Sequence, residues 1–157
     1  MFAAARRYNV PLSVLYAVGM TESGRKGRMS PWAMNIDGVS HASPTLQQGV
    51  EAFRRAKRAG ARFIDIGCMQ INERFHGRNF ARIEDVFDPR KNVDYAARFL
   101  RDLRAREGNW TSAAARYNAG PGNQPAQRNY VCAVIRSMVA SRTGDWTPSA
   151  RKLCGPT

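Results

Sequence analysis

One carboxyl group stands in a sequence context that suits acid–base chemistry. It belongs to Glu22, in the run Met20-Thr21-Glu22-Ser23-Gly24. Pro11 suits a first helical turn, apolar residues follow it at helical spacing, and Gly24 can end the helix. The carboxyl then lies at the negative end of the helix dipole and beside apolar side chains, so we expect its pKa to be raised, as a general acid requires. Taken alone, however, this pentapeptide fits a solvated glutamate at a helix end better.

Three further segments have unusual local chemistry. A glycine and two amides stand among apolar residues in Gly67-Cys68-Met69-Gln70-Ile71-Asn72, an aromatic and an amide stand beside flexible backbone in Tyr117-Asn118-Ala119-Gly120-Pro121-Gly122, and Tyr130 follows on the last expected helix. Taken singly, each has a structural explanation: a core turn, a helix end with its breaker, and a core tyrosine. Only their combination with the run around Glu22 points to a function.

In this order the four segments resemble the lysozyme-like catalytic domain of lytic transglycosylases, the soluble-lytic-transglycosylase family. That family is marked by Glu-Ser-Gly, then Gly-Leu-Met-Gln, then Ala-Tyr-Asn-Ala-Gly, then a late tyrosine. The resemblance covers about residues 8 to 140. Cys68 stands where the family has Leu, and Arg116 stands where it has Ala. Neither difference removes a group with catalytic chemistry.

The resemblance implies cleavage of peptidoglycan without water. A single glutamate, here Glu22, would protonate the glycosidic oxygen between N-acetylmuramic acid and N-acetylglucosamine. The same residue, now a carboxylate, would take the proton of the sugar 6-hydroxyl, and a 1,6-anhydro ring would close. No cofactor and no metal is implied.

The resemblance also implies supporting roles for residues of all four segments. Ser23 could hold Glu22 in place, and the Tyr130 hydroxyl could donate a hydrogen bond to Glu22. Met69 is expected to pack on a pyranose ring, and two glycines, Gly67 and Gly120, to let backbone approach the substrate. The substrate-binding or supporting set is Ser23, Gly67, Met69, Gln70, Asn72, Tyr117, Asn118, Ala119, Gly120 and Tyr130.

The elements that must position these residues are mostly helices. Breakers and apolar spacing predict helices that end near residues 23, 60, 108, 117 and 142, with Ser43 capping the second and the Asp88-Pro89 pair opening the third. Two short β-prone runs, 32–36 and 63–66, predict a minor β element of two or three strands. We therefore expect a mainly α, lysozyme-like α+β domain over residues 1–142 and an irregular tail over residues 143–157.

Composition narrows the class of partner. The chain has 157 residues, 43% of them hydrophobic, and a formal charge of +13, so a folded domain that seeks polyanions is expected. The basic residues are scattered and no nucleic-acid-binding motif is visible, so nucleic acid is not expected as a partner. No apolar run is long enough for a transmembrane segment or for a signal peptide, so an exported protein would be represented here by its mature part.

The three cysteines give no metal site by their spacing. Cys132 and Cys154 lie on the last expected helix and in the tail, and in an oxidising compartment they are the natural disulfide. In the cytosol both would be free thiols. Because the resemblance places the protein in the periplasm, we expect the Cys132–Cys154 bond, with Cys68 reduced and buried.

Three alternatives stay open beside a transglycosylase. A hydrolytic muramidase on the same fold would activate water with Asp37 or Asp65. A non-catalytic wall-binding or secretion-scaffold domain would not need Glu22, and a nucleic-acid binder is supported by charge alone. The expected partners are peptidoglycan glycan strands, together with flagellar-rod or secretion-system components, and the expected state is a monomer.

Overall fold

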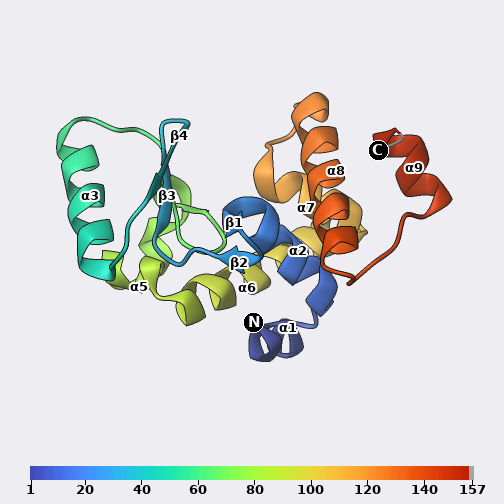
Figure 1. The fold of residues 1–157 in the computed structure, drawn as a ribbon, viewed down its shortest axis with the longest axis horizontal. Helices are drawn as coiled ribbons and strands as arrows, with labels where there is room; N and C mark the ends of the chain where they lie inside the picture. Colours follow the sequence, from blue (N-terminus) through green and yellow to red (C-terminus); the bar gives the residue numbers. More distant parts are fainter. Residues whose placement is uncertain (156–157) are drawn as a thin grey trace. The chain divides into compact units, whose positions relative to one another are not determined.

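The computed structural model describes residues 1–155 and divides the chain into two compact units. The first unit joins both ends of the sequence, Met1–Thr21 and Ala97–Thr157, and the second is the continuous segment Glu22–Ala96 (Figure 1). Two helices, at Leu12–Ser23 and Pro89–Glu107, contain the boundaries between the units.

The first unit is helical over its described residues. Its core is built from side chains that are almost fully buried, among them Leu15, Val18, Leu100 and Leu103. Burying an aliphatic side chain of this size stabilises the fold by about 1.5–3 kcal/mol. The helices of this unit, two of them shared at the boundaries, are α1 (Phe2–Tyr8), α2 (Leu12–Ser23), α6 (Pro89–Glu107), α7 (Trp110–Asn118), α8 (Gln124–Ala140) and α9 (Pro148–Cys154).

Side-chain caps fix where several of these helices begin. Asn109 accepts a hydrogen bond from the N–H of Ser112 at 2.7 Å at the start of α7, and Asn123 caps α8 in the same way. Helix α7 packs against α8. The hydroxyls of Thr21 and Ser137 lie 3.0 Å apart and connect α2 to α8.

The second unit contains the sheet. Within the described residues its four strands follow the order β4-β3-β5-β6, and every neighbouring pair is antiparallel. A separate two-stranded hairpin, β1 with β2, follows α2 directly. The elements of this unit are β1 (Gly24–Arg25), β2 (Arg28–Met29), β3 (Ala33–Ile36), β4 (Val39–Ala42), α3 (Leu46–Arg58), β5 (Ile64–Ile66), β6 (Ile71–Asn72), α4 (Glu73–His76), η1 (Gly77–Asn79) and α5 (Ile83–Phe87).

The two faces of this sheet differ in polarity. One row of cross-strand partners, Met34, Ile66 and Ile71, is almost fully buried. Because side chains alternate along a strand, the neighbouring row lies on the opposite face. That row is polar and crosses all four strands: Ser40, Asn35, Asp65 and Asn72.

The mainly helical fold with a small antiparallel sheet agrees with the prediction, and the differences lie in the details. The expected β element had two or three strands, from the runs that form β3 and β5, and the sheet also includes β4 and β6. The residues of β4 are all exposed and so carry no apolar alternation. The second predicted helix begins later than expected, because Thr45 rather than Ser43 accepts the capping bond, from the N–H of Gln48.

The expectation of an irregular tail over residues 143–157 is wrong where α9 forms. Thr147 caps this helix by accepting a hydrogen bond from the N–H of Ala150 at 3.1 Å, and Pro148 occupies its first turn. This Thr-Pro start signal was present in the sequence. The last two residues of the tail, 156 and 157, lie outside the described residues, and the division at residue 142 stays a prediction.

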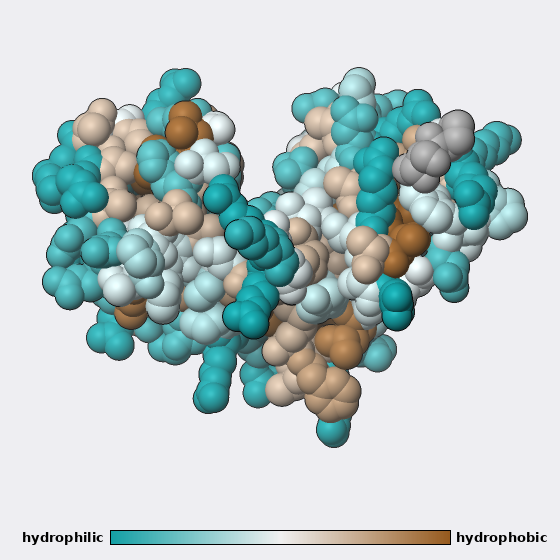
Figure 2. Space-filling view, in the orientation of Figure 1, coloured by the Kyte–Doolittle hydropathy of each residue, from teal (hydrophilic) through white to brown (hydrophobic). Residues whose placement is uncertain are grey.

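Hydrophilic residues occupy much of the face in view, as expected for a chain of this charge (Figure 2). Apolar residues appear on it as separate small areas. Among the described helices, none combines the length and the apolar character that crossing a membrane would require.

Candidate active site

Glu22 is the second-last residue of α2 and is half-buried. Its neighbour Ser23 is buried, and the Ser23 hydroxyl donates a hydrogen bond of 2.7 Å to the carbonyl oxygen of Cys68. The same hydroxyl accepts from the N–H of Ser30 at 3.3 Å. The end of α2 that carries the glutamate is therefore fastened to the segment around Cys68 by a buried side-chain bond.

That segment forms a tight turn at residues 67–70. The N–H of Gln70 donates to the carbonyl of Gly67 at 3.1 Å, and Gln70 has a φ of 46°, in the left-handed region that non-glycine residues rarely adopt. Its side-chain Nε2 donates to the carbonyls of Gly67, at 2.9 Å, and Ala33, at 3.3 Å. The amide nitrogen is thus occupied within the protein, so a sugar contact by Gln70 would use its oxygen.

Asn92, on α6, holds the 67–70 turn and the chain next to it through three hydrogen bonds. Its Oδ1 accepts from the N–H of Met69 at 2.8 Å, while its Nδ2 donates to the carbonyls of Ile66 and Val86, both at 2.9 Å. The residue is 0% exposed, and these bonds satisfy a side chain that would be costly to bury unpaired. Sequence reasoning missed Asn92, although a polar residue one turn before the buried Ala96 was a usable signal.

Gly67 has a reason within the protein to be glycine. Its φ is 83°, and a Cβ at this position would lie 2.7 Å from the Nδ2 of Asn92. The expectation that Gly67 admits substrate is therefore not needed to explain the residue. The Met69 side chain is fully buried and supports the turn, and its packing on a pyranose ring stays a prediction.

The polar row of the sheet belongs to the same unit as Glu22. Asn72 donates to the carboxylate of Asp65 at 2.7 Å, and it also caps α4 by accepting from the N–H of Phe75. Burial raises the pKa of Asp65, and the bond from Asn72 opposes this shift. The Asp37 carboxylate accepts backbone N–H bonds from Arg62 and Phe63, which ties the β3–β4 turn to the chain before β5.

The remaining predicted residues belong to the first unit. Tyr117 and Asn118 end α7, and the Tyr117 ring lies 5.6 Å from that of Phe99. Asn118 is exposed, while Ala119 is buried. The exposed Gly120 that follows accepts a hydrogen bond of 2.8 Å at its carbonyl from Gln127. Tyr130 is buried on α8.

The cysteines are arranged as an oxidising compartment would allow. Cys132 on α8 and Cys154 on α9 form a disulfide, the pair that the sequence favoured. Cys68 is a buried free thiol, and burial raises its pKa, so it carries little thiolate. Among residues 1–155 no group of three or more His, Cys, Asp or Glu side chains is placed to hold a metal ion.

The structure thus brings one set of predicted residues together in the second unit: Glu22, Ser23, Gly67, Met69, Gln70 and Asn72. The first unit holds Tyr117, Asn118, Ala119, Gly120 and Tyr130. A family model described as the transglycosylase SLT domain matches residues 1–135. Comparison with curated proteins and with solved structures gives no match.

Proposed function

Because the chain belongs to the transglycosylase SLT domain family, and is thus a peptidoglycan lytic transglycosylase, we propose that Glu22 is its single acid/base. We further propose that it cleaves the bond from N-acetylmuramic acid to N-acetylglucosamine and leaves 1,6-anhydro ends.

The proposed reaction uses one carboxyl group twice. Protonated Glu22 gives its proton to the glycosidic oxygen as the bond from this oxygen to C1 of N-acetylmuramic acid breaks. The acetamido group of the same sugar stabilises the positive centre. The Glu22 carboxylate then takes the proton of the 6-hydroxyl while O6 bonds to C1, which closes the anhydro ring and restores the acid. No water is consumed.

The observation that carries this proposal is the buried hydrogen bond from Ser23 to the carbonyl of Cys68. It fastens the helix end that bears Glu22 to the 67–70 turn, and Asn92 holds the same turn through the N–H of Met69. A proton donor must be held in place to act on a bound sugar, and these hydrogen bonds fix the position of the helix end that carries it. Gln70 and Asn118 would each bind sugar groups, and Tyr130 stays a predicted supporting residue.

The compartment and the partners follow from the substrate and the disulfide. Peptidoglycan lies outside the cytoplasm, and the Cys132–Cys154 bond suits an oxidising periplasm. We therefore propose an exported, periplasmic enzyme. Its task would be local wall opening for a secretion, conjugation or flagellar machine.

The test is digestion of purified sacculi by the wild type and by Glu22→Gln. The substitution keeps the shape and removes proton transfer, so clearance of turbidity should fall to background, a loss of several orders of magnitude, while sacculus binding persists. Mass spectrometry of wild-type products should show anhydro ends. Substantial clearance by Glu22→Gln would refute the assignment.

A hydrolytic muramidase is the second candidate, and the polar row of the sheet favours it. Asp65 is half-buried in that row, and a carboxylate there could activate water. Because burial raises the pKa of Asp65, its carboxylate forms at a higher pH than that of an ordinary aspartate. Hydrolysis by this route would give reducing ends whose share increases with pH and disappears in Asp65→Asn. Anhydro ends alone, unchanged in Asp65→Asn, would exclude this candidate.

A further inference from the structure

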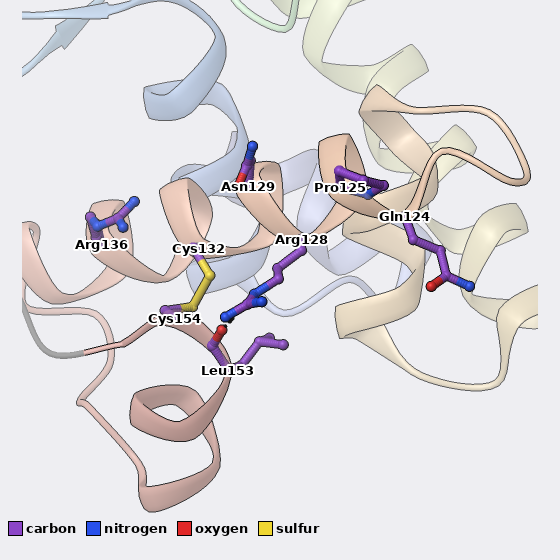
Figure 3. Close-up of a pocket in the computed structure, with 8 residues that line it drawn as sticks. All are labelled: Gln124, Pro125, Arg128, Asn129, Cys132, Arg136, Leu153 and Cys154. Carbon is purple, nitrogen blue, oxygen red and sulfur yellow. Dashed lines mark hydrogen bonds between the residues drawn. A yellow bond between two sulfur atoms is a disulfide. The ribbon is translucent and has the colours of Figure 1, made fainter.

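A cavity of about 740 Å³ lies between α8 and α9, on the first unit (Figure 3). Its walls come from residues 124–136 of α8 and from the end of α9. The lining residues are Gln124, Pro125, Arg128, Asn129, Cys132, Arg136, Leu153 and Cys154. None of the predicted active-site residues is among them.

The cavity is held open by a covalent bond and a polar bond. The Cys132–Cys154 disulfide joins the two helices, and the Arg128 Nε donates a hydrogen bond of 2.8 Å to the carbonyl of Leu153 (Figure 3). Because Nε makes this bond, the terminal nitrogens of the same guanidinium can still serve a ligand. The walls are thus formed before any ligand arrives.

The positive charge of this region indicates that the ligand of the cavity is an anion. Two arginines and no acidic residue are among the described residues that line the cavity. The first unit as a whole has twelve Lys and Arg and three Asp and Glu, a formal charge of 12 − 3 = +9. The second unit has thirteen and nine, a charge of 13 − 9 = +4.

The spacing of the two arginines indicates that this anionic ligand is elongated. Arg128, Cys132 and Arg136 follow one another at intervals of four residues, so they share one side of α8. At 1.5 Å rise per residue the two arginines stand about 12 Å apart along the helix. A four-residue peptide in extended form spans about 13 Å, so it could present one carboxylate to each guanidinium.

We propose that this cavity binds the stem peptides of peptidoglycan through their free carboxylates. The inference rests on the proposed function, because peptidoglycan is the substrate, but it concerns a site apart from the predicted catalytic residues. Stem peptides carry several carboxylates along a short chain, which matches the two arginines and the polar Gln124 and Asn129. The cavity would hold the enzyme on peptide-bearing regions of the wall.

The test is titration of the intact, oxidised protein with a free stem tetrapeptide, L-Ala-γ-D-Glu-diaminopimelate-D-Ala, by calorimetry and by NMR. This probe contains no glycosidic bond, so the result does not depend on cleavage. The matched variants are Arg136→Gln and Arg106→Gln, since both remove one exposed arginine from a helix. Arg136→Gln should weaken binding about fivefold, as loss of one exposed charge pair does, and Arg106→Gln should leave it unchanged.

A second variant and two further probes complete the test. Cys154→Ser frees one wall of the cavity and should also weaken binding, with circular dichroism showing that the fold persists. A tetrapeptide with amidated carboxylates should bind poorly. The inference is overturned if the tetrapeptide does not bind, or if both arginine variants weaken its binding equally. It is also overturned if amidation of the tetrapeptide has no effect, or if a short oligonucleotide binds more tightly than the tetrapeptide and depends on Arg136. Failure of Glu22→Gln to abolish clearance would refute the proposed function and leave this titration untouched.

Discussion

Two glycine-bearing segments carry family motifs, and they are built in opposite ways. In the 67–70 turn the Met69 N–H and the Gln70 side-chain nitrogen both donate hydrogen bonds to protein groups, and a Cβ on Gly67 would meet the side chain of Asn92. In the segment after α7, a Cβ on Gly120 would meet no described atom within 4 Å, and the residue is exposed. The described contacts explain why residue 67 is a glycine, but they give no reason for a glycine at residue 120.

This difference separates two uses of a motif. The 67–70 turn is a scaffold whose residue types are required by its own hydrogen bonds, whatever binds beside it. The segment at residues 118–120 presents an exposed amide and an exposed glycine, so any requirement there arises from something that the segment meets. Substitutions on the scaffold should reduce stability, whereas those on the exposed segment should reduce only activity.

The largest effect on stability is expected from Asn92→Ala. The change leaves the N–H of Met69 and the carbonyls of Ile66 and Val86 without their buried partner, at a cost of about 4 kcal/mol in the free energy of unfolding. Urea denaturation followed by circular dichroism measures this loss, with the exposed Asn79→Ala as the control. Similar stability for the two variants would mean that the turn does not depend on Asn92.

Gly67→Ala should cost about 2–3 kcal/mol, because the added methyl group meets Asn92 and the φ of 83° is strained for alanine. The matched variant is Gly120→Ala, which should change stability by less than about 0.5 kcal/mol. The same denaturation experiment decides between them, and sacculus clearance shows whether Gly120 matters to the substrate. Equal losses of stability would remove the distinction between the two segments.

Ser23→Ala should lower stability less than Asn92→Ala or Gly67→Ala does, by about 1–2 kcal/mol, since one buried hydrogen bond to the carbonyl of Cys68 is lost. Its effect on turnover should be larger than its effect on stability suggests, because the helix end that carries Glu22 loses its fastening. Thermal unfolding and clearance rates report the two quantities, and Ser40→Ala on the exposed strand β4 is the control. Full activity in Ser23→Ala would show that this bond does not position the glutamate.

Much of the fold could be read from the sequence where the signal is local. The opening of α6 at Pro89 and the strand at Ile64–Ile66 follow from a proline and from β-branched residues. Strand β4 could not be read in this way, because its pairing with β3 is made by exposed residues without an apolar pattern. Helix α9 was not predicted, although Thr147 and Pro148 are a helix start signal.

The site could be predicted as a set of residues but not as a network. The four motifs named Ser23 and Gln70, yet their partners are backbone carbonyls that belong to distant segments. Asn92 belongs to no motif, and its importance comes from three contacts that only the folded chain creates. Such long-range hydrogen bonds leave no periodic pattern in a sequence.

The division of the chain also sets an order of events during synthesis. Residues 22–96 are continuous, so the second unit is complete while the ribosome is still making the rest. The first unit needs residues 97–157 as well as residues 1–21, so the buried side chains of Leu15 and Val18 must wait for the later segment before their unit is complete. Contacts over such sequence separation form slowly, so these apolar side chains stay exposed for longer during synthesis than those of the second unit.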